Sequence, residues 1–201
     1  METRPKVSCA IPIHNMENAA FFLRRLMQSL ERQTFKDFEI VITKEDGTMA
    51  QNTNAAIKKC KGELIKILYM DDYLAHESAL ENMVESFKSG WLATGCIHDN
   101  GAHLFNTHYP AYNDEIHLGK NTIGSPSVIM IENKEPLLFD ETMNWLLDCD
   151  YYKRLHARYG KPTLLQNVDV VIGVGKHQTT HKLTDEEKLS EHDYLNQKYG
   201  E

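Results

Sequence analysis

Short apolar runs alternate with helix-like segments along the first half of the chain. The apolar runs are residues 7–13, 38–43 and 64–68. The segments that carry apolar side chains three and four positions apart are residues 17–32, 49–60 and 76–87. Runs without regular polar alternation are typical of strands buried on both faces, and the second spacing is typical of amphipathic helices. This order predicts an α/β fold with a mostly parallel central sheet flanked by helices on both faces.

The second half of the chain is less regular. The expected strands are residues 91–98, 127–131 and 164–174. Residues 145–159 carry apolar and aromatic side chains four positions apart, which predicts a helix. Residues 99–121 are rich in His, Asn and Tyr and predict a loop or a short hairpin. Residues 184–201 are strongly charged, which predicts a surface helix or a partly disordered tail.

Length and composition fit a single globular domain. The chain has 201 residues, of which 41% are hydrophobic and 25% are charged, so it is long enough to bury a core. The net charge is −7 and the basic residues form no stripe, which argues against a nucleic-acid partner. No apolar run reaches the length of a membrane span, and no apolar leader segment follows the first residue.

The cysteines are spread along the chain and form no closely spaced pair. They are Cys9, Cys60, Cys96 and Cys149. Disulfide frameworks and zinc sites show denser or paired cysteines, whereas scattered cysteines are typical of reduced thiols. We therefore expect a cytoplasmic protein in which all of these thiols are free.

Two adjacent carboxylates, Asp71 and Asp72, follow the apolar run at residues 64–68 almost directly. In an open α/β sheet, ligands bind at the carboxyl ends of the strands, where His14 and Asp46 also follow predicted strands. Neighbouring carboxylates repel each other and stay ionised most readily beside a cation. The pattern predicts a divalent cation that binds a phosphorylated ligand. The alternative is that both acids only cap the helix that follows.

Several segments, in this order, resemble the family 2 glycosyltransferases, which have the GT-A fold. Residues 7–15, Val-Ser-Cys-Ala-Ile-Pro-Ile-His-Asn, resemble the opening strand of the family, and residues 33–42 resemble its second strand. The acidic turn at residues 45–48, Glu-Asp-Gly-Thr, resembles Asp-Asp-Gly-Ser. Further resemblances lie at residues 50–52, 62–65, 139–141, 148–150 and 154–155. The match runs from about residue 6 to about residue 175, and the order of the motifs makes it specific.

The resemblance implies a small single-domain member of that family, with the GT-A fold of nucleotide-diphospho-sugar transferases. We expect residues 1–183 to form the transferase domain and residues 184–201 to form a charged tail. Within the domain, residues 6–98 would bind the nucleotide and residues 99–183 the acceptor. Such an enzyme transfers a sugar, with inversion, from a nucleotide-diphosphate sugar to a hydroxyl of a glycan or other acceptor. A UDP-sugar is the favoured donor, and the oligomeric state is left open.

The resemblance also assigns the donor site. The donor-binding residues that it implies are Pro12, His14, Asn15, Glu45, Asp46, Asn52, Asp71 and Lys176. A carboxylate at Asp46 can accept the N–H of uracil, although the same Asp-Gly pair is typical of an ordinary turn. The implied metal ligands are Asp71, Asp72 and His177, which would hold Mn2+ or Mg2+ against the diphosphate. A flexible polar segment is the alternative for Lys176 and His177.

Asp148 is the implied general base. It would accept a proton from the acceptor hydroxyl as that oxygen attacks the anomeric carbon. Two alternatives stay open, a helix-capping role for Asp148 and a catalytic role for Asp150. We expect the acceptor site near residues 108–112 and 124–127. Trp145 either stacks on a sugar or packs in the core.

Three positions depart from the family pattern. Tyr69 stands where the first acid of Asp-x-Asp is usual, Gln51 replaces an arginine, and His14 replaces a tyrosine. The first two changes favour an alternative function, a non-catalytic module that binds a glycan or a nucleotide sugar. A sugar nucleotidyltransferase is a weaker alternative, because residues 14–18 after the first predicted strand contain neither glycine nor a basic residue.

Overall fold

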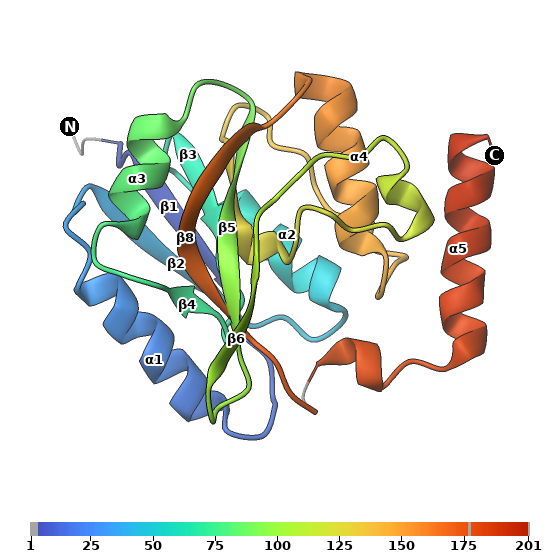
Figure 1. The fold of residues 1–201 in the computed structure, drawn as a ribbon, viewed down its shortest axis with the longest axis horizontal. Helices are drawn as coiled ribbons and strands as arrows, with labels where there is room; N and C mark the ends of the chain where they lie inside the picture. Colours follow the sequence, from blue (N-terminus) through green and yellow to red (C-terminus); the bar gives the residue numbers. More distant parts are fainter. Residues whose placement is uncertain (1–3, 177, 201) are drawn as a thin grey trace.

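The computed structural model describes residues 4–176 and 178–200 (Figure 1). Its strands are β1 (Val7–Pro12), β2 (Phe38–Thr43), β3 (Leu64–Ile67), β4 (Tyr73–Leu74), β5 (Trp91–Asp99), β6 (Leu104–His108), β7 (Ile129–Glu132) and β8 (Thr163–Gly173). Its α-helices are α1 (Ala19–Glu31), α2 (Met49–Lys59), α3 (Ala79–Ser86), α4 (Leu147–Tyr159) and α5 (Asp185–Tyr199). Short 3-10 turns span Ile116–Leu118, Pro126–Val128 and Thr179–His181.

The strands of the described residues form one eight-stranded mixed sheet in the order β2-β1-β3-β7-β5-β8-β4, with β6 beside β5. β1 pairs in parallel with β2 and with β3, and β5 pairs in parallel with β8. β7 lies antiparallel between β3 and β5. As a result, β1, β2, β3, β5 and β8 all run in the same direction. Their carboxyl ends therefore meet along one edge of the sheet. The predicted α/β class, with helices flanking a central sheet, is confirmed.

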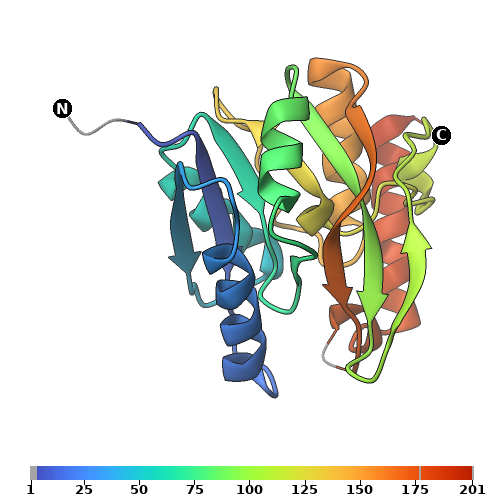
Figure 2. The same ribbon diagram turned by 60° about the vertical axis from the view of Figure 1, so that its left-hand side comes forward.

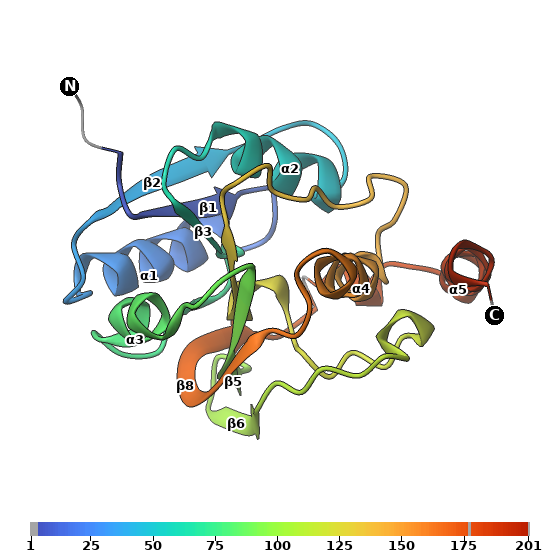
Figure 3. The same ribbon diagram turned by 90° about the horizontal axis from the view of Figure 1, so that it is seen from above.

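Helices cover both faces of the sheet. α1 and α3 lie on one face, α2 and α4 lie on the other, and α5 is outermost, beyond α4 (Figure 3). Figure 2 shows β8, β5 and β6 side by side, on the side of the sheet away from β2. The core holds fully buried strand residues such as Ile11, Ile65 and Leu92, and Trp91 stacks on Tyr152 with ring centroids 6.0 Å apart. Burial on both faces explains why the strands are continuous apolar runs.

Local chemistry shifts the ends of several elements. α1 begins at Ala19, two residues later than predicted, because Asn18 has a φ of 60° that a right-handed helix does not contain. Pro126 opens a 3-10 turn, so β7 begins at Ile129 rather than two residues earlier. The sequence did not predict the short strand β4, which pairs antiparallel with the end of β8. That pairing brings the loop after β3 against β8.

The charged tail folds as helix α5, one of the two predicted alternatives. Thr184 and Glu187 form a reciprocal capping box at its first turn. Leu195 is fully buried, and the helix packs against the turn at Ile116–Leu118. The last segment of the chain is therefore part of the folded body rather than a loose tail.

Two further expectations concern thiols and membrane segments. Cys9, Cys60, Cys96 and Cys149 are all free, as predicted. Within residues 4–176 and 178–200, no helix combines the length and the apolar character that a membrane span requires. The cytoplasmic location and the division into a nucleotide half and an acceptor half stay predictions.

Candidate functional site

A cavity of about 170 Å3 lies at the edge of the sheet where the parallel strands end. Its walls come from the loops after β1 and β3, the turn before β7, the start of α4, and the end of β8 with the segment that follows. The sequence-predicted residues on these walls are His14, Asp71, Asp72, Trp145 and Asp148. The fold therefore brings the acids that follow β3 into the same cavity as the acid of α4, from positions far apart in the sequence.

Asp72 is buried, with 2% of its surface exposed, and both of its carboxylate oxygens are engaged. The backbone N–H of Gly173 donates to Oδ1 at 2.9 Å, and the hydroxyl of Ser125 donates to Oδ2 at 3.3 Å. Burial, together with the neighbouring Asp71 carboxylate, raises the pKa of Asp72 well above its usual value. Asp72 thus joins the loop after β3 to β8 and to the turn before β7.

Asp71 lies half-buried on the wall of the cavity. Arg25 of α1 fixes its backbone, because Nη2 donates to the Asp71 carbonyl at 2.6 Å. The same guanidinium pairs with Asp99 through Nη1 at 2.7 Å and lies over the Tyr73 ring, 4.2 Å from the centroid. Arg25 therefore holds the acidic loop between α1 and the end of β5, and its planar group suits this combination of contacts.

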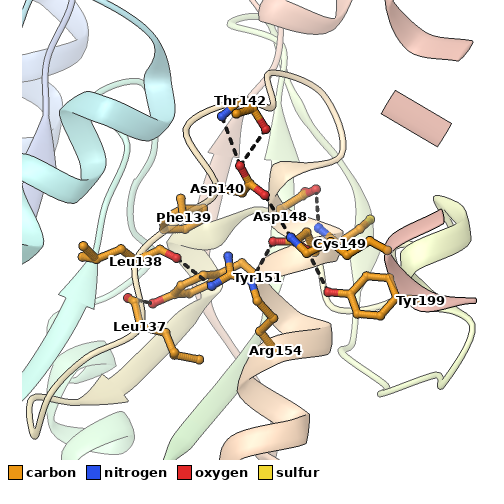
Figure 4. A network of polar contacts seen from close by, with 12 residues as sticks. Leu137, Leu138, Phe139, Asp140, Thr142, Asp148, Cys149, Tyr151, Arg154 and Tyr199 are labelled. Atoms are coloured by element: carbon orange, nitrogen blue, oxygen red, sulfur yellow. Dashed lines mark hydrogen bonds and ion pairs between the residues drawn. The ribbon is translucent and has the colours of Figure 1, made fainter. Parts of the chain in front are cut away.

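Asp148 occupies the first turn of α4, beside the cavity. Its Oδ1 accepts the backbone N–H of Cys149 at 2.8 Å (Figure 4). Its Oδ2 accepts the side-chain amide of Asn121 at 2.7 Å. Burial raises the pKa of Asp148 to about 6, against the lowering effect of these hydrogen bonds. A carboxylate with this pKa is ionised at neutral pH and is a stronger proton acceptor than an exposed aspartate.

Asp150, the alternative base, faces away from the cavity and is fully buried. Its Oδ2 pairs with Nε of Arg154 at 2.7 Å. Its Oδ1 meets Nζ of Lys198 at 2.8 Å and the hydroxyl of Tyr199 at 2.7 Å. Figure 4 shows Tyr199 and Arg154 on this side of α4. These contacts indicate a structural ion-pair network, so the geometry favours Asp148 over Asp150 as the base.

Two of the predicted donor residues support the loops around the cavity. Pro12 is buried at the end of β1. Asn52 is 4% exposed, and its amide nitrogen donates to the carbonyl of Ile13 at 2.7 Å. The amide oxygen of Asn52 accepts the backbone N–H of Glu45 at 3.3 Å. Asn52 therefore joins the loop after β1 to the loop after β2, and it supports the site without lining the cavity.

The remaining predicted donor residues are exposed and lie off the cavity wall. They are Asn15, Glu45, Asp46 and Lys176. Glu45 forms an exposed ion pair with Lys59, with 3.3 Å between Oε1 and Nζ. Contacts of these side chains with a nucleotide stay predictions. His177, the predicted third metal ligand, lies outside the described residues.

The chemistry of the wall is compatible with a divalent cation, and the predicted set of metal ligands stays a prediction because His177 lies outside the described residues. The described residues contain no group of three or more His, Cys, Asp and Glu side chains placed to hold a metal ion. Asp72 is buried, whereas Asp71 lies half-buried on the cavity wall, so Asp71 is the carboxylate of that loop best placed to act as a ligand. Mg2+ is commonly held by one or two carboxylates together with substrate phosphates and water, so Asp71 and a diphosphate fit such an ion.

A second cavity of about 350 Å3 adjoins the first and shares Ser125, Ile172 and Gln178 with it. Its other polar side chains come from the β5–β6 hairpin and the loop that follows, and they are His98, Asn106, His108 and Asn121. Gly124 also lines it, so part of the predicted acceptor region does form a cavity wall. Tyr112 does not, because it stacks on His156 with ring centroids 3.9 Å apart.

Sequence reasoning missed several residues that shape the site. Asn121 holds the Asp148 carboxylate, Gly173 holds Asp72, and Gln178 and Thr180 complete the wall after β8. Arg25 fixes the acidic loop from another helix. The only available signal was weak: Asn121 stands just before the Gly-Ser-Pro turn, a position typical of a side chain that bonds nearby backbone. The others depend on contacts between distant segments.

The sequence matches no protein-family model, and it matches no curated protein. Solved structures of S. aureus TarS share its fold. TarS 1-349 in complex with UDP-GlcNAc has a TM-score of 0.67 and 15% identity over 94% of this chain and 65% of that chain. TarS 1-349 in complex with UDP has a TM-score of 0.64 and 16% identity over 85% of this chain and 61% of that chain. This chain thus spans less than two thirds of those structures, and the likeness shows a glycosyltransferase fold of the GT-A type.

Proposed function

We propose that this protein is a glycosyltransferase of the family 2 type. It takes a sugar from a nucleotide-diphosphate sugar, with UDP as the favoured nucleotide, and transfers it with inversion to a hydroxyl of a glycan or other acceptor. The observation that carries the proposal is the single cavity that joins Asp71, at the carboxyl end of β3, to Asp148, at the start of α4. The complexes of S. aureus TarS with UDP and with UDP-GlcNAc support a uridine donor for the shared fold.

Asp148 is the proton acceptor in this mechanism. The acceptor hydroxyl gives its proton to the Asp148 carboxylate while its oxygen forms a bond to the anomeric carbon. The bond between that carbon and the diphosphate oxygen breaks on the opposite face, which inverts the configuration. Asn121 and the backbone N–H of Cys149 each hold one carboxylate oxygen of Asp148, which fixes the direction of the remaining lone pairs that can accept the proton. With a pKa of about 6, the group is ionised at neutral pH.

Asp71 is the residue that would hold a divalent cation, Mn2+ or Mg2+, together with the donor diphosphate. When bound, such a cation neutralises the charge that builds up on the departing diphosphate. Arg25 keeps the backbone of Asp71 in place, and Asp72 anchors the same loop to β8. The chain itself thus supplies a fixed loop that presents one carboxylate to the cavity.

The second cavity is the proposed acceptor site. It opens beside Asn121, which contacts Asp148, so an acceptor bound there can present a hydroxyl to the base. Its polar lining of His, Asn, Ser and Gln side chains contains no Lys or Arg. Groups of this kind exchange hydrogen bonds with hydroxyls, whereas an anionic polymer would require cationic partners. A neutral, hydroxyl-rich acceptor fits this lining best.

Two observations favour the alternative of a binding module without turnover. Gln51, which stands in place of the arginine usual in the family, has its side chain engaged in the capping box of α2. Its amide oxygen accepts the backbone N–H of Thr48 at 2.9 Å, so it points back at its own helix. Tyr69 brings a phenol to the wall where an acid is usual. Each change removes a charged side chain that would help to bind a diphosphate and its metal ion.

The two functions separate in one experiment. Binding of UDP-, GDP- and dTDP-sugars is measured by calorimetry, each with Mn2+ and with a chelator, and release of the free nucleotide is then followed with a panel of neutral glycosides. The transferase proposal predicts metal-dependent binding of one nucleotide class and nucleotide release that depends on an acceptor. Binding without release under every condition would favour the binding module. No binding of any donor, with or without metal, contradicts the transferase proposal and favours a module that binds a glycan.

A further inference from the structure

Glu191, in the middle of α5, contacts the start of α4 in an unusual way. Its Oε1 accepts the backbone N–H of Asn144 at 2.7 Å, and its Oε2 accepts that of Leu146 at 2.8 Å. The N–H of Trp145 lies within reach of both oxygens, at 3.2 Å and 3.0 Å. One carboxylate from another helix therefore holds three consecutive backbone amides.

This contact satisfies the backbone N–H of Leu146, the N-cap residue of α4, and those of the two residues before it. The N-cap residue of α4 is Leu146, whose side chain offers no hydrogen bond, and the first backbone N–H groups of a helix have no partners within the helix. These groups also carry the positive end of the helix dipole, which a carboxylate offsets. Leu146 offers no side-chain acceptor, so the only side-chain carboxylate bonded to the backbone that leads into α4, among the described residues, comes from α5.

The amides that Glu191 holds belong to a wall of the proposed active site. Asn144 and Trp145 line the cavity, and Asp148 follows in the first turn of α4. A shift of this backbone therefore moves the base directly. No other side chain among the described residues has a recorded hydrogen bond to the backbone N–H groups of residues 144–146.

We propose that Glu191 is a positioning residue for Asp148: its carboxylate fixes the backbone that leads into α4 at the cavity and places a negative charge at the positive end of that helix. This inference rests on the proposed function, in which Asp148 is the base. The positive end of a helix favours the ionised form of a nearby carboxyl and so makes it a weaker base. A fixed negative charge at Glu191 opposes that effect.

Helix α5 keeps its place without Glu191, because other residues anchor it. Leu195 is fully buried. Lys198 pairs with Asp140 at 2.9 Å and with Asp150 at 2.8 Å, and the hydroxyl of Tyr199 also meets Asp150. A substitution at Glu191 therefore changes the contact with the backbone that leads into α4 without releasing helix α5.

Other titratable groups surround Asp148, and the test must leave them unchanged. They are Cys149 and Tyr152 on α4, Tyr69, Asp71 and Asp72 after β3, His14 after β1, and Lys188 and His192 of α5 beside Trp145. Glu191→Gln alters none of them. It keeps the length of the side chain, removes the charge, and leaves one acceptor oxygen where there were two.

The test compares Glu191→Gln with Asp193→Asn, which removes the same charge from an exposed position of α5. We expect Glu191→Gln to lower kcat at least about tenfold, because a small displacement of the base is costly. The acidic limb of the pH–rate profile should move down by about half a pH unit. Asp193→Asn should change neither. Glu191→Asp keeps the charge but shortens the side chain. Its pH–rate profile should therefore have its acidic limb near the wild-type pH, while its kcat stays below the wild-type value.

A second readout does not depend on turnover. The carboxyl carbon of Asp148 can be titrated by 13C NMR, with Asp148→Asn as the assignment control. Titration at lower pH in Glu191→Gln than in the wild type supports the proposal. Titration at the same pH in both proteins, or an equal shift in Asp193→Asn, overturns it. If the wild type binds and turns over no donor, the proposed transferase function fails, while this titration still decides the role of Glu191.

Discussion

The backbone N–H of Gly173 donates to the Asp72 carboxylate at 2.9 Å, across a sequence separation of 101 residues. This bond joins the last residue of β8 to the loop that follows β3. The approach is close, because a Cβ atom at Gly173 would lie 2.4 Å from the backbone oxygen of Asp71. The two halves of the chain thus meet at the acidic loop, and the position of Asp71 depends on a glycine in the other half.

Gly173→Ala should therefore displace the acidic loop. The new methyl group meets backbone, which cannot rotate away, so we expect destabilisation by about 1–3 kcal/mol and weaker donor binding. Urea unfolding and donor calorimetry measure the two effects. Gly62→Ala is the matched control, since its Cβ would lie 2.6 Å from the backbone nitrogen of Ser8, away from the cavity. Equal loss of donor binding in both variants would contradict the prediction.

Asp148→Asn should keep donor binding and lose transfer. The amide preserves the shape of the side chain but accepts no proton, so we expect kcat to fall by a factor of about 100 or more. In the wild type, activity should rise with pH through about 6, because burial raises the pKa of Asp148 to that value and only the ionised form is a base. A pH–rate profile without an inflection in that region would refute this assignment.

Asp71→Ala should abolish the part of donor binding that depends on Mn2+ or Mg2+. The side chain faces the cavity, so its loss removes the carboxylate that would share the ion with the diphosphate. Calorimetry with Mn2+ and with a chelator gives the comparison. Asp37→Ala removes an exposed aspartate just before β2 and serves as the control. Metal-dependent binding that survives in Asp71→Ala would show that the ligand is another residue.

Arg25→Met should loosen the acidic loop. The substitution keeps the apolar part of the side chain near Tyr73 but removes the bonds to the Asp71 carbonyl and to Asp99. Because hydrogen bonds of charged groups contribute about 1.5–3 kcal/mol, we expect unfolding to become easier by about 2 kcal/mol, with a higher donor Kd. Arg24→Met on the exposed side of α1 should leave both unchanged. A normal Kd in Arg25→Met would exclude a positioning role.

Lys66 of β3 is fully buried, and its ammonium group donates to the carbonyls of Ser127 and Ile129. Lys66→Met should cost about 2 kcal/mol, because it leaves these buried carbonyls without a donor. Burial lowers the pKa of Lys66 to about 8, below its usual 10.5. Between these pH values the unfolded chain binds the proton and the folded chain does not, so this group adds stability as pH rises. Denaturant titrations should show that contribution in the wild type only.

The sequence predicts most of the architecture because periodicity reports burial directly. The runs at residues 38–43 and 64–68 became β2 and β3 with ends that moved by at most one residue. The segment after β3 was harder to predict, because a strand as short as Tyr73–Leu74 leaves no periodic signal in the sequence. It forms only because β8 offers a partner edge, which is a property of the assembled sheet.

The candidate site was predictable in part. Asp71 and Asp148 line one cavity, and both positions were visible in the sequence as a strand end and a helix start, while their roles stay predictions. Asn52 was predicted as a donor contact, yet it bonds backbone on two loops. Asp46 and Lys176 point into solvent. Side-chain direction within a turn depends on local backbone geometry that residue types alone do not specify.

The amino-acid sequence by itself determined the α/β class, the order of its elements and the placement of acids after β3 and at the start of α4. The tertiary structure decided where each acid lies. Asp148 and Asp150 are two residues apart on one helix, yet one faces the cavity and the other meets Arg154, Lys198 and Tyr199. Periodicity fixes which face of a helix is buried. What lies against that face is set by the packing of distant segments, here the loop before β7 and helix α5.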